Sequence, residues 1–287
     1  MAVVALGKAG GREMMAGSDL DLMLIYDHPE GVTESRGTRR LPVSQWFVRA
    51  CHSYVAALTS PGADGPLYEV DMRLRPSGNK GPVAVSLGAF RRYHAESAWT
   101  WERMALTRAR VVAGPPALRS RIETAIAEAL QRPGDSDRIR ADAASMRSRM
   151  MRDLPPEGPW DVKLRSGGQI EVEFIAQVLQ LIHAADSPGP CSGTTRVALE
   201  RLAEAGKLLA EDAALLMRAD HLWRTIQGML RITVGRGARD ALPDASAQAL
   251  LRAVGSAVDL SALRTTMDDM AQQVRAAFVR YVGEVHA

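Results

Sequence analysis

The sequence predicts an α+β protein in two parts, with strands and helices over residues 1–132 and helices alone over residues 133–287. Three observations lead to this prediction. Apolar runs of strand length alternate with helical patterns in the first part. Residues 132–137 (RPGDSD) have the Pro, Gly and polar composition of a linker. Beyond them, apolar residues recur at helical spacing, which is typical of a bundle.

Strands are expected at three places in the first part. Residues 2–6 and 20–26 are apolar runs of strand length. Over residues 68–75, apolar side chains alternate with charged ones, which indicates a strand with one buried and one polar face.

Helices are expected wherever apolar residues follow a helical stripe. In residues 44–58 the stripe consists of Phe47, Cys51, Tyr54 and Leu58. Ser86 is the expected N-cap of a second helix that reaches residue 95, and residues 99–108 form a third. The helices of the second part are expected over residues 137–153, 167–184, 194–205, 211–234, 246–254 and 260–285.

Composition excludes several classes of protein. A chain of 287 residues with 46% hydrophobic and 24% charged residues can bury a sizeable core in two domains. Its net charge of +3 is spread along the chain, which argues against a nucleic-acid partner. Cys51 and Cys191 lack metal-ligand spacing, so they are expected to be reduced thiols of a cytoplasmic protein. Because no apolar run reaches transmembrane length, no membrane partner is expected either.

Two carboxylates, Asp19 and Asp21, open the second apolar run. Strand alternation places both on one face, with leucines on the other, and this arrangement is typical of a metal site. Gly10 and Gly11 form a turn just upstream that could offer free backbone N–H groups to the phosphates of a nucleotide carried on Mg²⁺. An isolated Asp-x-Asp is also common at a solvated strand end, so the surroundings decide between the two interpretations.

The third expected strand supplies a further carboxylate, Asp71, with Arg73 and Arg75 on the same polar face. If this strand pairs beside the Asp19 and Asp21 strand, three carboxylates converge, enough for one or two Mg²⁺ ions. The two guanidinium groups would then meet the charge of a triphosphate. Taken alone, the segment could equally be an ordinary strand with its charges in solvent.

One segment of the second part differs from a plain bundle. Residues 161–168 (DVKLRSGG) place Lys163 and Arg165 before Gly167 and Gly168 at the start of a helix. Basic residues at a helix N-terminus suit an anion. A flexible entry loop with solvated basic side chains is the alternative.

Five ordered motifs together closely resemble the bifunctional glutamine synthetase adenylyltransferase/adenylyl-removing enzyme family, within the DNA polymerase β-like nucleotidyltransferase superfamily. The family carries two homologous halves, and the resemblance covers nearly the whole chain but one half of such an enzyme. Residues 17–21 and 99–102 look like the C-terminal, adenylylating half. The motifs are residues 7–13 (GKAGGRE), 17–22 (GSDLDL), 71–78 (DMRLRPSG), 99–102 (WTWE) with 107–114 (TRARVVAG), and 161–174 (DVKLRSGGQIEVEF).

The resemblance implies roles for the two parts and for individual residues. Residues 1–132 would be the nucleotidyltransferase catalytic domain, and residues 133–287 a helical bundle that completes the nucleotide and substrate site. The implied catalytic Mg²⁺ ligands are Asp19, Asp21 and Asp71. The implied nucleotide-binding residues are Gly10, Gly11, Ser18, Lys163, Gly167 and Gly168, with Arg73 and Arg75 beside the phosphates. Ala9, residues 164–166 and Glu171 depart from the family pattern, so Arg165 and Glu171 receive no role.

The implied activity is Mg²⁺-dependent transfer of AMP from ATP to a tyrosine hydroxyl of glutamine synthetase, with release of pyrophosphate, in the regulation of nitrogen assimilation. Glutamine and the nitrogen regulatory PII protein would act through the full-length enzyme. A tyrosine hydroxyl, with an unperturbed pKa of about 10, needs deprotonation to attack, and Asp71 is the expected proton acceptor. Two alternatives stay open: the phosphate-dependent deadenylylating half, and a regulatory binding fragment without activity.

Overall fold

The computed structural model describes residues 1–63, 65–187, 189, 191–235 and 241–285. Two compact units are distinguished within the chain. One comprises Met1–Arg132 and Ser192–Thr194, and the other comprises Pro133–Cys191 and Thr195–Ala287. Each unit is described by itself below. The α+β class expected from the sequence is confirmed.

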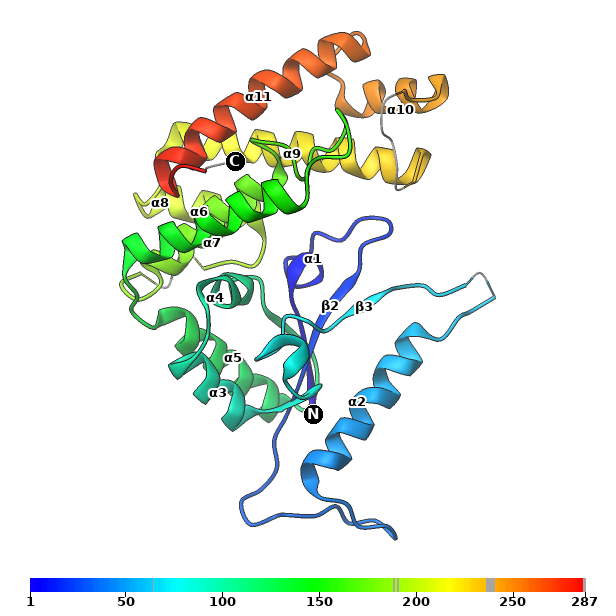
Figure 1. Ribbon diagram of the computed structural model, residues 1–287, viewed down its shortest axis with the longest axis vertical. Helices are drawn as coiled ribbons and strands as arrows, with labels where there is room; N and C mark the ends of the chain where they lie inside the picture. The colour runs from blue at the N-terminus through cyan, green and yellow to red at the C-terminus, as the bar shows by residue number, and fades with distance from the viewer. Residues whose placement is uncertain (64, 188, 190, 236–240, 286–287) are drawn as a thin grey trace. The chain divides into compact units, whose positions relative to one another are not determined.

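The first unit is built on a mixed sheet (Figure 1). β1 pairs antiparallel with β2 and β5, whereas β3 and β4 pair parallel with successive parts of β2. β2 is therefore the centre of the sheet, and its residues Met23 and Ile25 are completely buried. The strands are β1 (Ala2–Ala5), β2 (Leu20–Tyr26), β3 (Val70–Asp71), β4 (Ala84–Ser86) and β5 (Arg110–Ala113).

Helices cover the strands on both sides, with α2 on one side and α3, α4 and α5 on the other (Figure 1). The predicted stripe of α2 packs on Leu22, Leu24 and Tyr26 of β2. Ser86 caps α3 as predicted, since its side chain accepts a hydrogen bond of 3.2 Å from the Ala89 N–H. The helices are α1 (Gly7–Gly10), α2 (Val43–Thr59), α3 (Leu87–Glu96), α4 (Thr100–Leu106) and α5 (Pro116–Gln131), with a 3-10 turn at Gly78–Lys80.

The strand predicted over residues 68–75 is wrong beyond β3. The chain turns after Asp71 because the Arg75 side chain folds back, donating to Met72 O at 2.7 Å and to Gly81 O at 3.2 Å. Ser77, in the left-handed region at a φ of 62°, completes the turn. Helix α5 was not predicted, although Pro116 stands in its first turn, where proline is favoured.

Among its described residues, the second unit contains helices and connecting loops, with no strand. Every helix predicted from the sequence is present, with ends that differ by a few residues. α7 contacts α6, α8, α9 and α11, which explains why most of its residues are buried. The helices are α6 (Ser136–Asp153), α7 (Gln169–His183), α8 (Thr195–Glu204), α9 (Ala210–Thr233), α10 (Asp244–Val254) and α11 (Leu260–Tyr281).

Among the described residues, no helix is both long enough and apolar enough to span a bilayer. Cys51 and Cys191 are both free thiols, and burial raises the pKa of the Cys51 thiol to about 11.

Candidate active site

The N-terminal end of β2 brings two of the three predicted carboxylates side by side. β3 pairs with β2 in a parallel register that places Asp21 opposite Asp71, and Leu20 N donates to Glu69 O at 2.8 Å. The pairing that the sequence analysis required is therefore present. Residues in register on adjacent strands point to the same face, so both carboxylates share one face of the sheet.

A tight turn leads the chain into Asp19. Ser18 is buried, its hydroxyl accepts a hydrogen bond of 3.1 Å from Met15 N, and its own N–H donates to Met15 O at 3.0 Å. These two bonds close the turn. Ser18 thus holds the backbone that presents the adjacent carboxylate.

Arg73 forms an ion pair with Asp71, the carboxylate of β3. Asp71, which it hydrogen-bonds, raises the pKa of the Arg73 guanidinium most, and Asp21 and Asp19 raise it further. All three predicted carboxylates therefore act on one exposed cation. Arg73 Nε lies 2.8 Å from Asp71 Oδ2 and 3.0 Å from Oδ1, and this pairing lowers the pKa of Asp71.

Asp21 is confined by the start of α1. Leu6 N donates to Asp21 O at 2.9 Å, and a Cβ atom added at Gly7 would stand 2.0 Å from Asp21 Oδ2. Gly7 has a φ of +49°, which favours glycine, and the carboxylate fills the space a side chain would need. The position of α1 therefore fixes the space around Asp21.

The glycine turn does not offer the free amides that the sequence suggested at Gly10 and Gly11. Gly10 N donates to Leu6 O at 2.7 Å, and Gly11 N donates to Gly7 O at 3.1 Å. Close packing accounts for Gly10, because a Cβ atom there would stand 2.0 Å from the backbone oxygen of Arg108. The expectation of free N–H groups at these two positions was wrong, and their role in nucleotide binding stays a prediction.

The donor chemistry of this face suits Mg²⁺, because carboxylate oxygens are the ligands that this ion prefers. Among the described residues, however, no group of three or more His, Cys, Asp or Glu side chains is already arranged to hold a metal ion. Instead, the Asp71 carboxylate forms an ion pair with Arg73. Asp71 would have to exchange this partner to become a ligand. Because 72% of the Arg73 side chain is exposed, that exchange requires little repacking.

Arg75 has a different environment from Arg73. It is buried, and its donors are directed at carbonyl oxygens of its own loop, on Met72 and Gly81. Burial lowers the pKa of Arg75. These contacts make it a loop-forming residue, and contact with phosphate stays a prediction.

In the second unit, the amides around the start of α7 are used within the chain. Gly167 N donates to Glu171 Oε2 at 3.0 Å, Gly168 N to Arg165 O at 3.0 Å, and Gln169 N to Val162 O at 2.8 Å. The anion-binding corner expected from these amides is therefore not formed by them. Lys163 is exposed.

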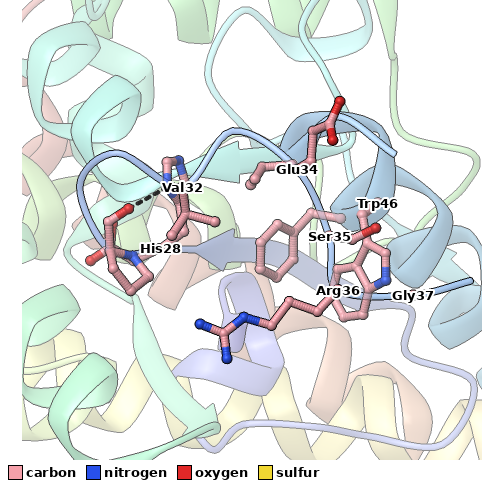
Figure 2. A pocket seen from close by; sticks show the side chains of 11 residues that line it. His28, Val32, Glu34, Ser35, Arg36, Gly37 and Trp46 are labelled. Carbon is pink, nitrogen blue, oxygen red and sulfur yellow. Dashed lines mark hydrogen bonds between the residues drawn. The ribbon is translucent and has the colours of Figure 1, made fainter. Parts of the chain in front are cut away.

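A hollow of about 480 Å³ lies at the opposite end of β2 (Figure 2). His28 and Val32 lie on one side of it and Trp46 on the other. It begins at Asp27, which directly follows β2. A seven-residue strand rises about 20 Å, so this hollow is separate from the carboxylates.

Comparison with known proteins supports the family suggested by the motifs. The family model for glutamate-ammonia ligase adenylyltransferase matches residues 1–125, and the model for GlnD PII-uridylyltransferase matches residues 140–282. A bifunctional glutamine synthetase adenylyltransferase/adenylyl-removing enzyme from Rhodopseudomonas palustris is 42% identical over 98% of the chain. The chain belongs to this adenylyltransferase family.

Relatives with the same name occur in other bacteria. The Xanthobacter autotrophicus protein is 41% identical over 97% of the chain, and the Brucella suis protein is 39% identical over 99%. The chain spans only 28–29% of the length of these adenylyltransferases.

Sequence reasoning gave no role to three residues that build this site. Glu13, Arg108 and Arg110 surround α1 with side-chain hydrogen bonds and an ion pair. Their signal was their position within two of the motifs that carry the family resemblance. Local strand and helix patterns do not indicate a contact between segments about 100 residues apart.

Proposed function

We propose that the chain carries the adenylylating activity of its family, transferring AMP from MgATP to a tyrosine hydroxyl of glutamine synthetase and releasing pyrophosphate. The observation that carries this proposal is the register of β2 with β3, which sets Asp21 beside Asp71. In this proposal residues 1–132 are the catalytic domain, and the reaction takes place in the cytoplasm.

Asp19, Asp21 and Asp71 would hold Mg²⁺. When bound, the ion neutralises phosphate charge and lowers the pKa of the attacking hydroxyl. Arg73 moves from Asp71 to the departing pyrophosphate, and so carries its positive charge to where negative charge develops. Asp71 accepts the tyrosine proton, although the lowered pKa that Arg73 imposes makes it a weak base until that cation moves.

Two other functions are consistent with the family name. The relatives are named as bifunctional, so the chain could instead correspond to the adenylyl-removing activity, which we expect to require inorganic phosphate. The second alternative is that the chain is a regulatory fragment without activity. The adenylylating proposal is favoured by residues 17–21 and 99–102, which look like the C-terminal half of the family. Glutamine and PII protein are proposed to act only through the full-length enzyme.

The deciding experiment combines the chain with unmodified glutamine synthetase and ATP labelled in the α-phosphate. We expect label on a tyrosine and an equal amount of pyrophosphate. Asp21→Asn, which keeps the shape of the side chain but removes an anionic ligand, should show no transfer while unfolding at the wild-type temperature.

Two results would contradict the proposal. Release of AMP from adenylylated glutamine synthetase only when phosphate is added would assign the chain to the opposite activity. Transfer by Asp21→Asn within about tenfold of wild type at saturating Mg²⁺ would remove the carboxylates from the site.

A further inference from the structure

We infer that Arg108 is a positioning residue of the transfer site, holding α1 in place against Asp21. This inference rests on the proposed function, since it concerns the same carboxylate site. Arg108 lies 87 positions after Asp21 (108 − 21) and two residues before Arg110, the first residue of β5.

The Arg108 guanidinium joins two parts of the segment that surrounds Asp21. Its Nε donates to Gly7 O at 3.0 Å, and its Nη2 forms an ion pair with Glu13. Both side chains of the pair are only 6% exposed. A buried arginine that spans a carbonyl and a carboxylate fixes the distance between them, because its donors form a rigid planar fork.

Arg110, two residues after Arg108, also binds α1, and we call the two arginine side chains together the clamp. Its Nη2 donates to Ala9 O at 2.7 Å and its Nε to Gly10 O at 3.1 Å. The two arginines together therefore bind three carbonyl oxygens of α1. A helix of four residues is too short to be stable by itself, so its carbonyl groups depend on such donors.

The clamp acts on Asp21 through Gly7. The carbonyl of Gly7 is held by Arg108, and the α-carbon of the same residue lies against the Asp21 carboxylate. Gly11 accommodates the clamp from the other side, since a Cβ atom there would stand 2.6 Å from Arg108 Nη2. Loss of the guanidinium would therefore release α1 and the wall it forms beside Asp21.

A double-variant experiment separates positioning from simple stability. Arg108→Met takes the buried ion-pair partner away from Glu13, and Glu13→Gln takes the anionic partner away from Arg108, so each should lower the unfolding temperature. Together, Arg108→Met and Glu13→Gln remove both charges of the pair, and most of the lost stability should return. Affinity for MgATP, measured by calorimetry, and AMP transfer should nevertheless stay about tenfold or more below wild type, because Gly7 O still lacks the hydrogen bond from Arg108.

Two further variants complete the design. Arg108→Lys keeps the charge, and we expect the same loss in affinity and transfer with a smaller loss of stability, because an ammonium group lacks the planar fork. Arg121→Met is the matched control, since Arg121 pairs with Asp27 at the far end of β2. This variant should change neither the affinity for MgATP nor AMP transfer. A double variant with wild-type MgATP affinity and transfer would overturn the inference.

Failure of the proposed function would look different. If the wild-type chain binds MgATP but transfers no AMP, the transfer activity is wrong, and the calorimetric comparison of the variants still decides the role of Arg108. If the wild-type chain does not bind MgATP, the site itself is overturned together with the inference.

Discussion

At the residue scale, the candidate site depends on how each charged side chain is partnered. Asp71 and Arg73 form an exposed pair, and exposed pairs contribute little to stability. Arg108 and Glu13 form a buried pair, in which either partner alone would be costly. Arg73 can therefore exchange its partner during a reaction, whereas Arg108 cannot. This difference explains why we assign Arg73 to phosphate and Arg108 to positioning.

Buried His94 leads to a prediction about pH. Desolvation, with a smaller effect from nearby Arg103, lowers its pKa from 6.5 to about 4. The unfolded chain therefore takes up a proton at a higher pH than the folded chain does. The free energy of unfolding should fall as the pH drops from 6.5 towards 4, by about 2 kcal/mol between pH 7 and pH 5.

The measurement is denaturant unfolding at a series of pH values. His94→Phe, which keeps a ring beside Phe90, should remove most of the fall between pH 7 and pH 5. Part of the slope should persist because burial also lowers the pKa of His183. His52→Gln changes an exposed histidine and is the control that should leave the slope unchanged. Identical slopes for His94→Phe and wild type would contradict this explanation.

At the element scale, a buried charge cluster holds the loop before α7. Arg147 donates to Leu164 O at 2.9 Å, to Arg165 O at 3.0 Å and to Glu171 Oε1 at 2.9 Å. Arg275 of α11 donates to the same carboxylate oxygen at 2.9 Å. The loop that the sequence presented as an anion site is thus formed around an internal carboxylate. Glu171, which received no role, is its centre.

Gly167 and Gly255 test what close packing contributes to this loop. Both have left-handed backbones, with φ of +69° and +70°. A Cβ atom on Gly167 would stand 1.8 Å from Ala271 O of α11, whereas a Cβ atom on Gly255 would enter open space, with nothing within 4 Å. Gly255→Ala should cost about 1 kcal/mol of unfolding free energy through the backbone alone. Gly167→Ala should cost about 1–3 kcal/mol more, because α11 has to move.

Chemical denaturation of the two alanine variants measures this difference directly. Equal losses would mean that α11 moves away from Gly167 without a measurable cost in unfolding free energy. A larger loss for Gly167→Ala would mean that close packing against α11 requires a glycine at this position. The presence of Gly167 in the family motif would then be explained without a bound anion.

At the scale of the whole molecule, the accuracy of the sequence analysis followed the range of the interactions concerned. Helices of the second unit were predicted because their apolar periodicity is local. Strand β3 was overextended because the alternation continues through Arg75, which instead turns back to bond Gly81 O. Helix α5 was missed because Pro115 and Pro116, which stand at its start, are also typical of a turn.

The candidate site shows the same limit. The strand patterns left the pairing of the Asp21 and Asp71 strands as a condition, and the structure meets this condition. The use of the Gly10 and Gly11 amides within α1 was missed, because glycine is a poor helix former and no pattern in the sequence indicated this short helix. Residue type and spacing therefore predicted which groups could act. Their hydrogen-bond partners required the tertiary structure.

A variant of Lys163 tests whether the helical part contributes to nucleotide binding. Its proposed role rests on the family resemblance, and an exposed lysine could equally be solvated. Loss of a charge-assisted hydrogen bond to nucleotide would cost about 1–3 kcal/mol, so Lys163→Ala should weaken MgATP binding or slow transfer by that amount. Its unfolding temperature without nucleotide should not change.

Lys207→Ala, in the same helical part, is the control that should leave MgATP affinity and turnover at wild-type values. Wild-type affinity and turnover in Lys163→Ala would exclude this lysine from nucleotide binding, while leaving the test of the Asp21 carboxylate unaffected.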